Sequence, residues 1–150
     1  MPDPKLQAFF AAHEEMIGRG DAAGLAAQFD FPILLELPGR EGWQAVERPE
    51  QLLPVIENKA AYIRMTGATS YDLEIQDVSP GEVDGQQDVS VRCSRTDRSG
   101  RRHVTVRATY SVRMDGVDPV IQRIRYNEID APLYAAAFES PAAQGLPLDS

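Results

Sequence analysis

The sequence predicts an α+β fold in which three amino-terminal helices pack on a strongly bent antiparallel or mixed sheet. Apolar residues recur at helical spacing up to residue 65, and they alternate with polar residues from residue 70 onward. Turn-forming dipeptides separate the alternating segments. A chain of 150 residues, 43% hydrophobic and 25% charged, has the size and composition of one folded domain. We expect this domain to span residues 1–139, followed by a loosely ordered tail over residues 140–150.

The first helix is predicted over residues 3–18. Asp3 can cap its amino end, Pro4 suits the first helical position, and Gly18 and Gly20 mark its end. Its apolar positions form one stripe, which should face the core. The stripe consists of Leu6, Phe9, Phe10, His13, Met16 and Ile17.

A short second helix follows the cap Asp21 and reaches Phe29, before Pro32 prevents its continuation. Extended segments are expected over residues 33–37 and 43–46. The third helix is expected to open at Pro49 and to continue to about Met65, with one apolar stripe directed at the core. Its predicted core positions are Leu52, Leu53, Ile56, Ala60 and Ile63.

Strict alternation predicts the strands of the second half. Short turns such as Asp84-Gly85, Ser99-Gly100 and Asp115-Gly116 join them, and short turns make neighbouring strands antiparallel. The alternating segments are 71–76, 89–94, 103–113 and 120–129. Helices followed by a meander of strands is the order of an α+β domain.

Charge is distributed unevenly along the chain, which has a formal net charge of −8. The segment from Arg92 to Arg125 carries nine arginines and only three aspartates. These arginines either lie exposed on a sheet surface or form a face for an acidic partner or a second copy of the chain. Because nucleic-acid binding depends on excess positive charge, we expect no nucleic-acid partner.

Composition also excludes several classes of site. A single cysteine, Cys93, excludes an internal disulfide and a four-cysteine metal site, and only two histidines, His13 and His103, make a multi-histidine site improbable. Nucleotide-binding and hydrolase motifs are absent from the sequence. We therefore expect no cofactor.

Without a long apolar run or a secretory signal pattern, a cytoplasmic protein with no membrane partner is expected.

The segment GRGDAAGLAAQF, residues 18–29, resembles the link between the first two helices of the NTF2-like superfamily, also called SnoaL-like or ketosteroid isomerase-like. The order of elements resembles that superfamily over nearly the whole chain. The segment FDFPILLELPGREGWQAVERPEQL is most similar to functionally unassigned bacterial members. The resemblance implies a cone in which helices close a bent sheet around a pocket, but it does not choose among the enzymes and binding subunits of this fold.

Comparison with ketosteroid isomerase can be made residue by residue. Counted from the Gly-Asp cap, the oxyanion-donating tyrosine of that enzyme falls at His13, and its catalytic aspartate falls at Leu37. A leucine cannot accept a proton. Glu36 is adjacent, but one step along a strand places it on the opposite face. The sequence therefore does not support the isomerase mechanism.

His13 and Glu128 are the candidate catalytic acid and base. His13 lies on the apolar stripe of the first helix, where an imidazole could exchange protons near neutral pH; alternatively, it is a core histidine with one hydrogen bond. Glu128 is separated from Ile124 and Tyr126 by an even number of residues, so on a regular strand all three point to the same face. We therefore expect Glu128 at the pocket wall, where burial would raise a carboxyl pKa. The alternative is a strand-end residue that faces water or pairs with an arginine.

Tyr110, Tyr126 and Trp43 are the candidate ligand-binding residues. The two tyrosines lie on the apolar face of their strands and could orient a polar ligand atom, or they could be core residues with a solvated hydroxyl. Trp43 could cover the pocket opening or fix a loop to the third helix.

These observations predict a protein that binds a small apolar organic ligand. If it is an enzyme, the expected class is a cofactor-free isomerase, dehydratase or hydrolase; the alternative is a noncatalytic homodimeric interaction or ligand-sensing module. The polar row on the 103–113 strand, which includes Arg107 and Arg113, is the expected dimer face, although antiparallel sheets also leave such faces in water.

Overall fold

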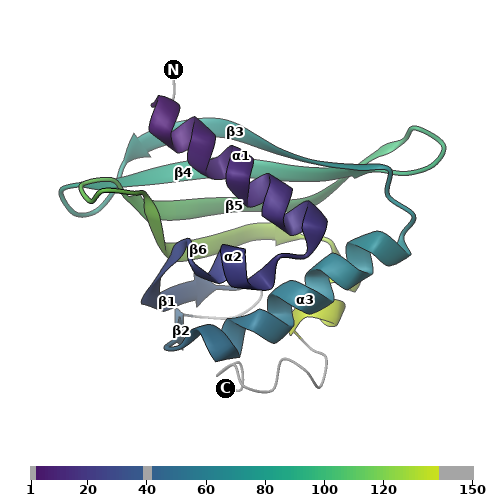
Figure 1. Cartoon of the computed structure of the whole chain (residues 1–150), viewed down its shortest axis with the longest axis horizontal. Helices are drawn as coiled ribbons and strands as arrows, with labels where there is room; N and C mark the ends of the chain where they lie inside the picture. Colours follow the sequence, from purple (N-terminus) through teal and green to yellow (C-terminus); the bar gives the residue numbers. More distant parts are fainter. Residues whose placement is uncertain (1–2, 39–41, 139–150) are drawn as a thin grey trace.

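A computed structural model describes residues 3–38 and 42–138, which form four helices and six strands (Figure 1). In chain order the elements are α1 (Pro4–Arg19), α2 (Ala22–Ala26), β1 (Phe29–Glu36), β2 (Gln44–Val46), α3 (Pro49–Met65), β3 (Ser70–Pro80), β4 (Gln86–Thr96), β5 (Arg102–Arg113), β6 (Val120–Ile129) and α4 (Ala131–Phe138). The α+β class and the three amino-terminal helices are as predicted.

The six strands form one mixed sheet in the order β2-β1-β6-β5-β4-β3. The β3, β4, β5 and β6 strands form an antiparallel meander, and β1 joins β6 in parallel. Antiparallel β2 completes the sheet beside β1. The amino-terminal strands therefore extend the meander at its β6 side.

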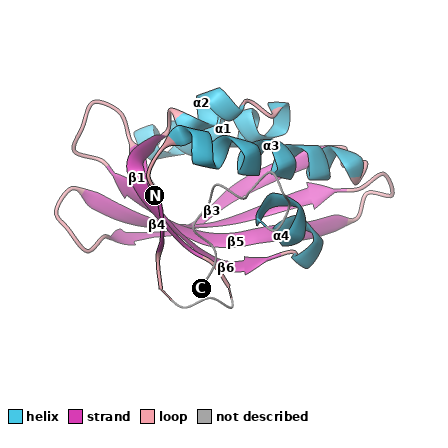
Figure 2. Ribbon diagram, turned by 90° about the horizontal axis from the view of Figure 1, so that it is seen from below, coloured by secondary structure: helices cyan, strands magenta, loops and turns pink. Residues whose placement is uncertain are grey.

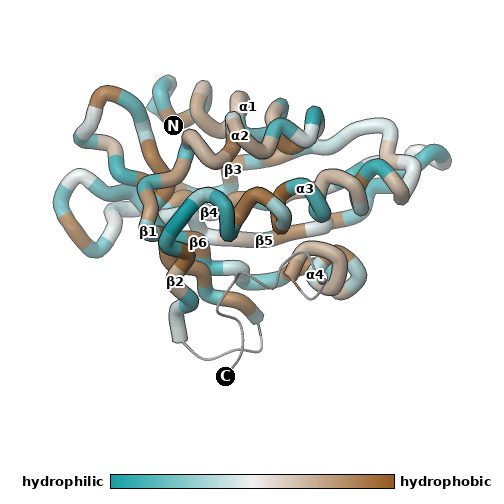
Figure 3. The backbone as a smooth tube through the Cα atoms, turned by 60° about the horizontal axis from the view of Figure 1, so that its bottom comes forward, coloured by the Kyte–Doolittle hydropathy of each residue, from teal (hydrophilic) through white to brown (hydrophobic). Residues whose placement is uncertain are grey.

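Three helices, α1, α2 and α3, lie across one face of the sheet, and α4 lies beside the sheet next to α3 (Figure 2). Both α1 and α3 contain hydrophilic and hydrophobic residues along their length (Figure 3), as expected for helices with one face on the core. None of the helices in the described part of the chain is long and apolar enough to cross a membrane.

Local sequence explains how α1 and α2 begin and end. The Asp3 side chain accepts a hydrogen bond from the Lys5 amide, and the Asp21 side chain accepts one from the Gly24 amide, so each aspartate caps a helix. Gly20 ends α1 with a φ of 68°, a left-handed conformation that glycine adopts without strain. The two helices therefore meet at a sharp, capped corner.

The core lies between the helices and the inner face of the sheet. The largest fully buried side chains include Tyr110, Phe10, Leu6, Ile33, Leu35 and Leu37. His13 is also buried, at 3% exposure. The predicted stripe of α1 thus packs inward, with Met16 half-buried at its edge.

Two elements differ from the sequence expectation. β1 already begins at Phe29, which was expected to end the second helix, and α4 was not predicted. The apolar sequence of α4 shows no polar face that would mark a helix. Asp130 caps it by accepting a hydrogen bond from the Leu133 amide. The predicted tail over residues 140–150 lies outside the described residues.

β6 contains two irregularities in its pairing with β5. The register shifts between the pairs Ser111↔Arg123 and Val112↔Ile121, and again between Arg107↔Glu128 and Ala108↔Tyr126. Each shift leaves one residue of β6, Gln122 or Asn127, without an opposite partner, which is a β-bulge. The bulges change which residues of β6 face the core.

Candidate functional site

A small cavity lies between the helices and the inner face of the sheet. Its volume is about 40 Å³, enough for about three water molecules. Ten of its fourteen lining residues are apolar, and four carry polar groups: His13, Lys59, Tyr110 and Tyr126. The apolar lining residues are Ile17, Leu25, Phe29, Leu52, Val55, Ile56, Ala60, Ile124, Ile129 and Phe138.

Gln28 fixes the orientation and tautomer of His13. The Gln28 Nε2 atom donates to the carbonyl oxygen of Phe9 at 3.2 Å, so its Oε1 atom points to Nδ1 of His13 at 2.7 Å. An amide oxygen can only accept, so Nδ1 carries the proton. In the neutral ring, Nε2 is then a hydrogen-bond acceptor, and it lies 3.4 Å from the hydroxyl of Tyr110.

Burial keeps the imidazole of His13 neutral. Desolvation is the main cause that lowers its pKa from 6.5 to about 4; the hydrogen bond to Gln28 acts in the opposite direction, and the charge of Lys59 lowers the pKa further. A neutral imidazole near pH 7 can accept a proton or a hydrogen bond, but it is not a proton donor at Nε2. The structure therefore favours the accepting role of His13 over an acid role.

Tyr110 and Tyr126 contribute two hydroxyl groups from adjacent strands to the cavity wall. The ring of Tyr110 packs edge-on against Phe10 and His13, with centroids 5.4 and 5.6 Å away. Tyr126 packs against Phe138 of α4 at 5.7 Å. Burial raises the pKa of both hydroxyls above the usual tyrosine value, so both keep their protons and can donate hydrogen bonds.

Lys59 of α3 is the fourth polar residue of the cavity, and the sequence analysis missed it. Burial of its ammonium group lowers its pKa from the usual lysine value. Within residues 3–38 and 42–138, no carboxylate forms an ion pair with Lys59. The cavity wall thus includes one half-buried lysine without a counter-charge from the described residues.

The sequence does contain a signal for Lys59. It lies three residues after Ile56, seven after Leu52 and four before Ile63, and is therefore on the apolar stripe of α3. A lysine in such a stripe must bury its charge or extend past the core. Gln28 has no comparable signal, because its contact with His13 depends on how α1 and β1 meet.

The prediction that Glu128 faces the pocket is wrong. Glu128 is exposed on the outer face, where its Oε2 lies 3.2 Å from Nε of Arg107. The bulge at Asn127 shifts the alternation by one residue, so Ile129 faces the cavity in place of Glu128. The expected acid–base pair of His13 and Glu128 is therefore not assembled.

Trp43 also lies away from the cavity. Its ring lies against two guanidinium groups, those of Arg123 and Arg125, each 5.2 Å from the ring centroid. Both arginines belong to the outward-facing residues of β6, so Trp43 covers part of the outer face and does not close the cavity opening. The sequence could not show this contact, because it depends on β2 and β6 lying on either side of β1.

The arginine-rich segment is largely neutralised within the chain. Arg107 pairs with Glu128 and Arg125 with Glu36 at 2.8 Å, each across neighbouring strands, and other arginines of the segment also pair with carboxylates. The further pairs are Arg92–Glu74, Arg102–Asp72, Arg113–Asp30, Arg113–Asp115 and Arg123–Glu82. Of the two interpretations of these arginines, the structure favours a solvated, internally paired surface.

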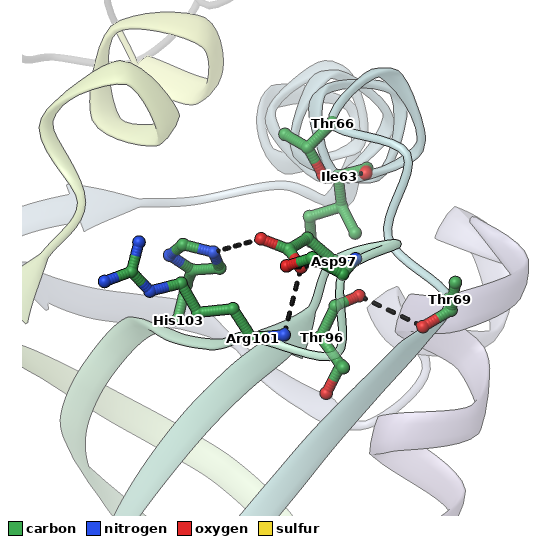
Figure 4. A network of polar contacts seen from close by, with 8 residues as sticks. Ile63, Thr66, Thr69, Thr96, Asp97, Arg101 and His103 are labelled. Atoms are coloured by element: carbon green, nitrogen blue, oxygen red, sulfur yellow. Dashed lines mark hydrogen bonds and ion pairs between the residues drawn. The ribbon is translucent and has the colours of Figure 1, made fainter.

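His103, the second histidine, lies away from the cavity, at the β4–β5 hairpin. Its Nε2 lies 2.8 Å from the carboxylate of Asp97, which also accepts from backbone and side-chain groups of the same turn (Figure 4). Those hydrogen bonds, led by the one from Ser99, hold the pKa of Asp97 well below its usual range. In the described part of the chain, no cluster of histidine, cysteine and carboxylate groups could hold a metal ion.

The position of the isomerase base is an ordinary core position here. Leu37 is 2% exposed, and the neighbouring Glu36 turns outward to Arg125. The Tyr110 proton goes to Nε2 of His13, so the cavity offers the Tyr126 hydroxyl as a donor, the Tyr110 oxygen as an acceptor and one amine, on otherwise apolar walls. Such an arrangement can hold a small organic molecule by one polar end.

No protein-family model and no curated protein matches this chain. Solved structures match it over most of its length. Aln2 from a Streptomyces species is 20% identical and superposes with a TM-score of 0.59, covering 91% of this chain and 98% of its own.

Two further matches have lower identity. An NTF-2 like protein of unknown function from Shewanella oneidensis is 15% identical, with a TM-score of 0.58 over 84% of this chain and 98% of its own. A proposed beta subunit of an aromatic-ring-hydroxylating dioxygenase from Novosphingobium aromaticivorans is 12% identical, with a TM-score of 0.57 over 88% of this chain and 93% of its own. Identities this low establish the fold alone. The fold of this chain is the NTF2-like fold that the sequence predicted.

Proposed function

We propose that this protein binds a small, largely apolar organic molecule in the cavity between α1, α3 and the sheet. The observation that carries this proposal is the composition of the cavity wall, in which four polar groups converge within ten apolar residues. Binding sites for small molecules commonly combine apolar walls with a few polar groups that fix orientation. The apolar part of the ligand would contact α3, and its polar end would contact Tyr110 and His13.

The size of the cavity restricts the ligand. About 40 Å³ accepts only a short molecule unless side chains move. A ligand oxygen would accept from the Tyr126 hydroxyl, whereas a ligand hydroxyl would donate to the oxygen of Tyr110, whose own proton goes to Nε2 of His13. A small neutral alcohol satisfies both conditions, and a small ketone satisfies the first.

A proton-transfer reaction receives less support than binding. His13 is a weak base, since its pKa is about 4, and Glu128 lies on the outer face. General acid–base catalysis at neutral pH works best with groups whose pKa lies near the operating pH. We therefore favour a ligand-binding module over an isomerase, dehydratase or hydrolase.

Methyl-resolved NMR with 1-propanol and 2-butanone tests the proposal. We expect shifts confined to methyl groups that line the cavity, such as those of Ile17, Val55 and Ile124. The variant Ala60→Val narrows the cavity and should abolish the shifts. Ala61→Val, the same change at the next residue of α3 and outside the cavity wall, should leave them unchanged. Equal shifts in both variants, or no shifts in the folded wild type, would refute binding at this site.

The homodimer is a second proposal, and it concerns the outer face of the sheet. That face carries Arg107, Thr109 and Arg113 from β5, and its ion pairs could be exchanged between two copies. Light scattering coupled to gel filtration should give twice the chain mass, falling to one chain mass for Thr109→Arg, which adds a like charge to the face. A wild-type protein of single chain mass at micromolar concentration would reject the dimer.

A further inference from the structure

Lysine is rare in this chain, and one of its two lysines lies in the cavity wall. The sequence contains 13 arginines among its 15 basic residues, so Lys5 and Lys59 are its only lysines. Lys5 is exposed on α1, with its ammonium donating to the carbonyl oxygen of Val117 at 3.2 Å. Lys59 lines the cavity together with His13, Tyr110 and Tyr126.

The surroundings of Lys59 provide no carboxylate to hold its charge. In the described residues it has neither an ion pair nor a hydrogen bond to an acidic side chain. The titratable groups near it are His13, which burial keeps neutral, and the thiol of Cys93 and the hydroxyls of Tyr110 and Tyr126, whose pKa values burial raises. An uncompensated ammonium in an apolar cavity is unfavourable, so the neutral amine is stabilised relative to an exposed lysine.

A neutral amine in an apolar cavity is a nucleophile for carbonyl carbon. From these observations we infer that Lys59 forms a reversible imine with a short aldehyde or ketone bound in the cavity. This inference rests on the proposed function, because it assigns a covalent chemistry to the same ligand site.

Imine formation needs only the groups at the site, and it releases one water molecule. The lone pair of Nζ attacks the carbonyl carbon, a C–N bond forms as the C=O π bond breaks, and one of the two Nζ protons is transferred to the carbonyl oxygen to give a neutral carbinolamine. Loss of the hydroxyl group as water, with loss of the nitrogen-bound proton, gives the imine; addition of water reverses the sequence. The Tyr126 hydroxyl is a donor to the oxygen, and the Tyr110 oxygen, whose proton goes to Nε2 of His13, is an acceptor in the same wall. No oxidant, reductant or metal takes part.

The size of the cavity restricts the substrate class. A volume of about 40 Å³, room for about three water molecules, excludes bulky carbonyl compounds, and a short one enters only as side chains of the wall move. The apolar residues around Lys59, including Val55 and Ile124, would contact the alkyl part. The site therefore selects small carbonyl compounds by both shape and chemistry.

Reductive trapping with propanal and sodium cyanoborohydride at neutral pH tests the inference. Reduction converts an imine into a stable propyl amine, and peptide mass spectrometry then identifies the modified lysine. We expect Lys59 to be labelled several times faster than Lys5, since burial lowers the pKa of Lys59 and a lower amine pKa raises the neutral, nucleophilic fraction. Labelling of Lys59 should saturate with propanal and should be inhibited by 1-propanol, which fits the same cavity but cannot form an imine.

Two variants complete the test. Lys59→Arg keeps a cation and Lys59→Met keeps the chain length; both should lose the fast labelling while circular dichroism shows the native fold. Lys5→Arg is the matched control, and it should leave the fast labelling unchanged. Equal labelling of Lys59 and Lys5 in the wild type would overturn the inference.

The outcome separates this inference from the proposed function. If 1-propanol shifts the cavity methyl groups but propanal does not label Lys59, the imine is rejected and the binding site remains. If neither compound shifts these methyl groups, the binding site is rejected and the imine with it.

Discussion

The hydroxyl of Tyr110 lies 3.4 Å from Nε2 of His13, although the two residues are 97 positions apart in the chain. The contact joins the centre of β5 to the inner face of α1. Because Gln28 holds the opposite nitrogen of the imidazole, the Tyr110 hydroxyl is the donor of this hydrogen bond. A three-residue chain of hydrogen bonds thus crosses the core beside the cavity.

Replacing Tyr110 with phenylalanine tests this chain. Tyr110→Phe leaves a buried acceptor without its donor, and we expect a loss of about 1 kcal/mol in the free energy of unfolding. Urea denaturation measures it. Tyr126→Phe, which removes a hydroxyl from the same wall without touching His13, is the control and should cost less. Equal losses would mean that the hydrogen bond to His13 contributes little.

His13 should make stability depend on pH. Its pKa is about 4 in the folded protein and near 6.5 when unfolded, so the unfolded chain binds more protons between these values. The stabilisation by the neutral imidazole is complete above pH 6.5 and is lost as the pH falls to 4. The shift corresponds to about 3 kcal/mol over this range. Urea denaturation at several pH values should show this loss in the wild type and a smaller loss in His13→Gln.

The second histidine provides the control for that measurement. His103→Gln removes a partly exposed imidazole at the β4–β5 hairpin and should keep the pH dependence between 4 and 6.5 that His13 causes. If His103→Gln flattened the profile and His13→Gln did not, the source of the pH dependence would be the hairpin.

Glu14 should protect the edge of the sheet. β3 is an edge strand, and the amide of Leu73 donates to Oε1 of Glu14, which reaches it from α1. Such coverage satisfies an amide that would otherwise be open to solvent or to another chain. Glu14→Ala should destabilise the protein by about 1–3 kcal/mol and accelerate hydrogen exchange at Leu73.

Two variants separate this contact from a general effect of charge. Glu14→Gln keeps an accepting oxygen and should restore part of the protection at Leu73. Glu15→Ala removes the neighbouring carboxylate, which is exposed and pairs with Arg19, and should cost at most about 0.5 kcal/mol. Unchanged exchange at Leu73 in Glu14→Ala would show that the amide is protected by other means.

Cys93 should be inert in the folded protein. It is fully buried on β4, and burial raises the pKa of its thiol, so little thiolate is present and none is accessible. Reaction with Ellman's reagent should be at least about a hundredfold slower in buffer than in urea, because it requires local or global opening. Rapid reaction without denaturant would contradict the placement of Cys93 in the core.

The sequence predicted the parts of the site that depend on regular periodicity. Spacing on α1 placed His13 inward, and alternation placed Tyr110 and Tyr126 on the inner face. The alternation failed at Glu128, since a β-bulge adds a residue at a position that no local pattern marks. The sequence analysis also missed Lys59 on α3, because a lysine on the apolar stripe of a helix is ordinarily interpreted as an exception at the edge of the core.

Contacts between distant segments could not be predicted from local sequence patterns, for a different reason. Gln28 reaches His13 only after α1 and β1 have packed, and Trp43 meets Arg123 only because β1 separates β2 from β6. Periodicity describes which way a residue points from its own element. It does not describe which residue of another element it meets.

The position of Trp43 has a practical consequence for spectroscopy. It is the only tryptophan of the chain, and its indole rests on two guanidinium groups at the back of the sheet. Its fluorescence emission therefore reports on the outer face of β6. A molecule bound in the cavity would not contact the indole. This geometry predicts that the emission changes with salt concentration. It also predicts that the emission stays constant during a titration with a small organic compound.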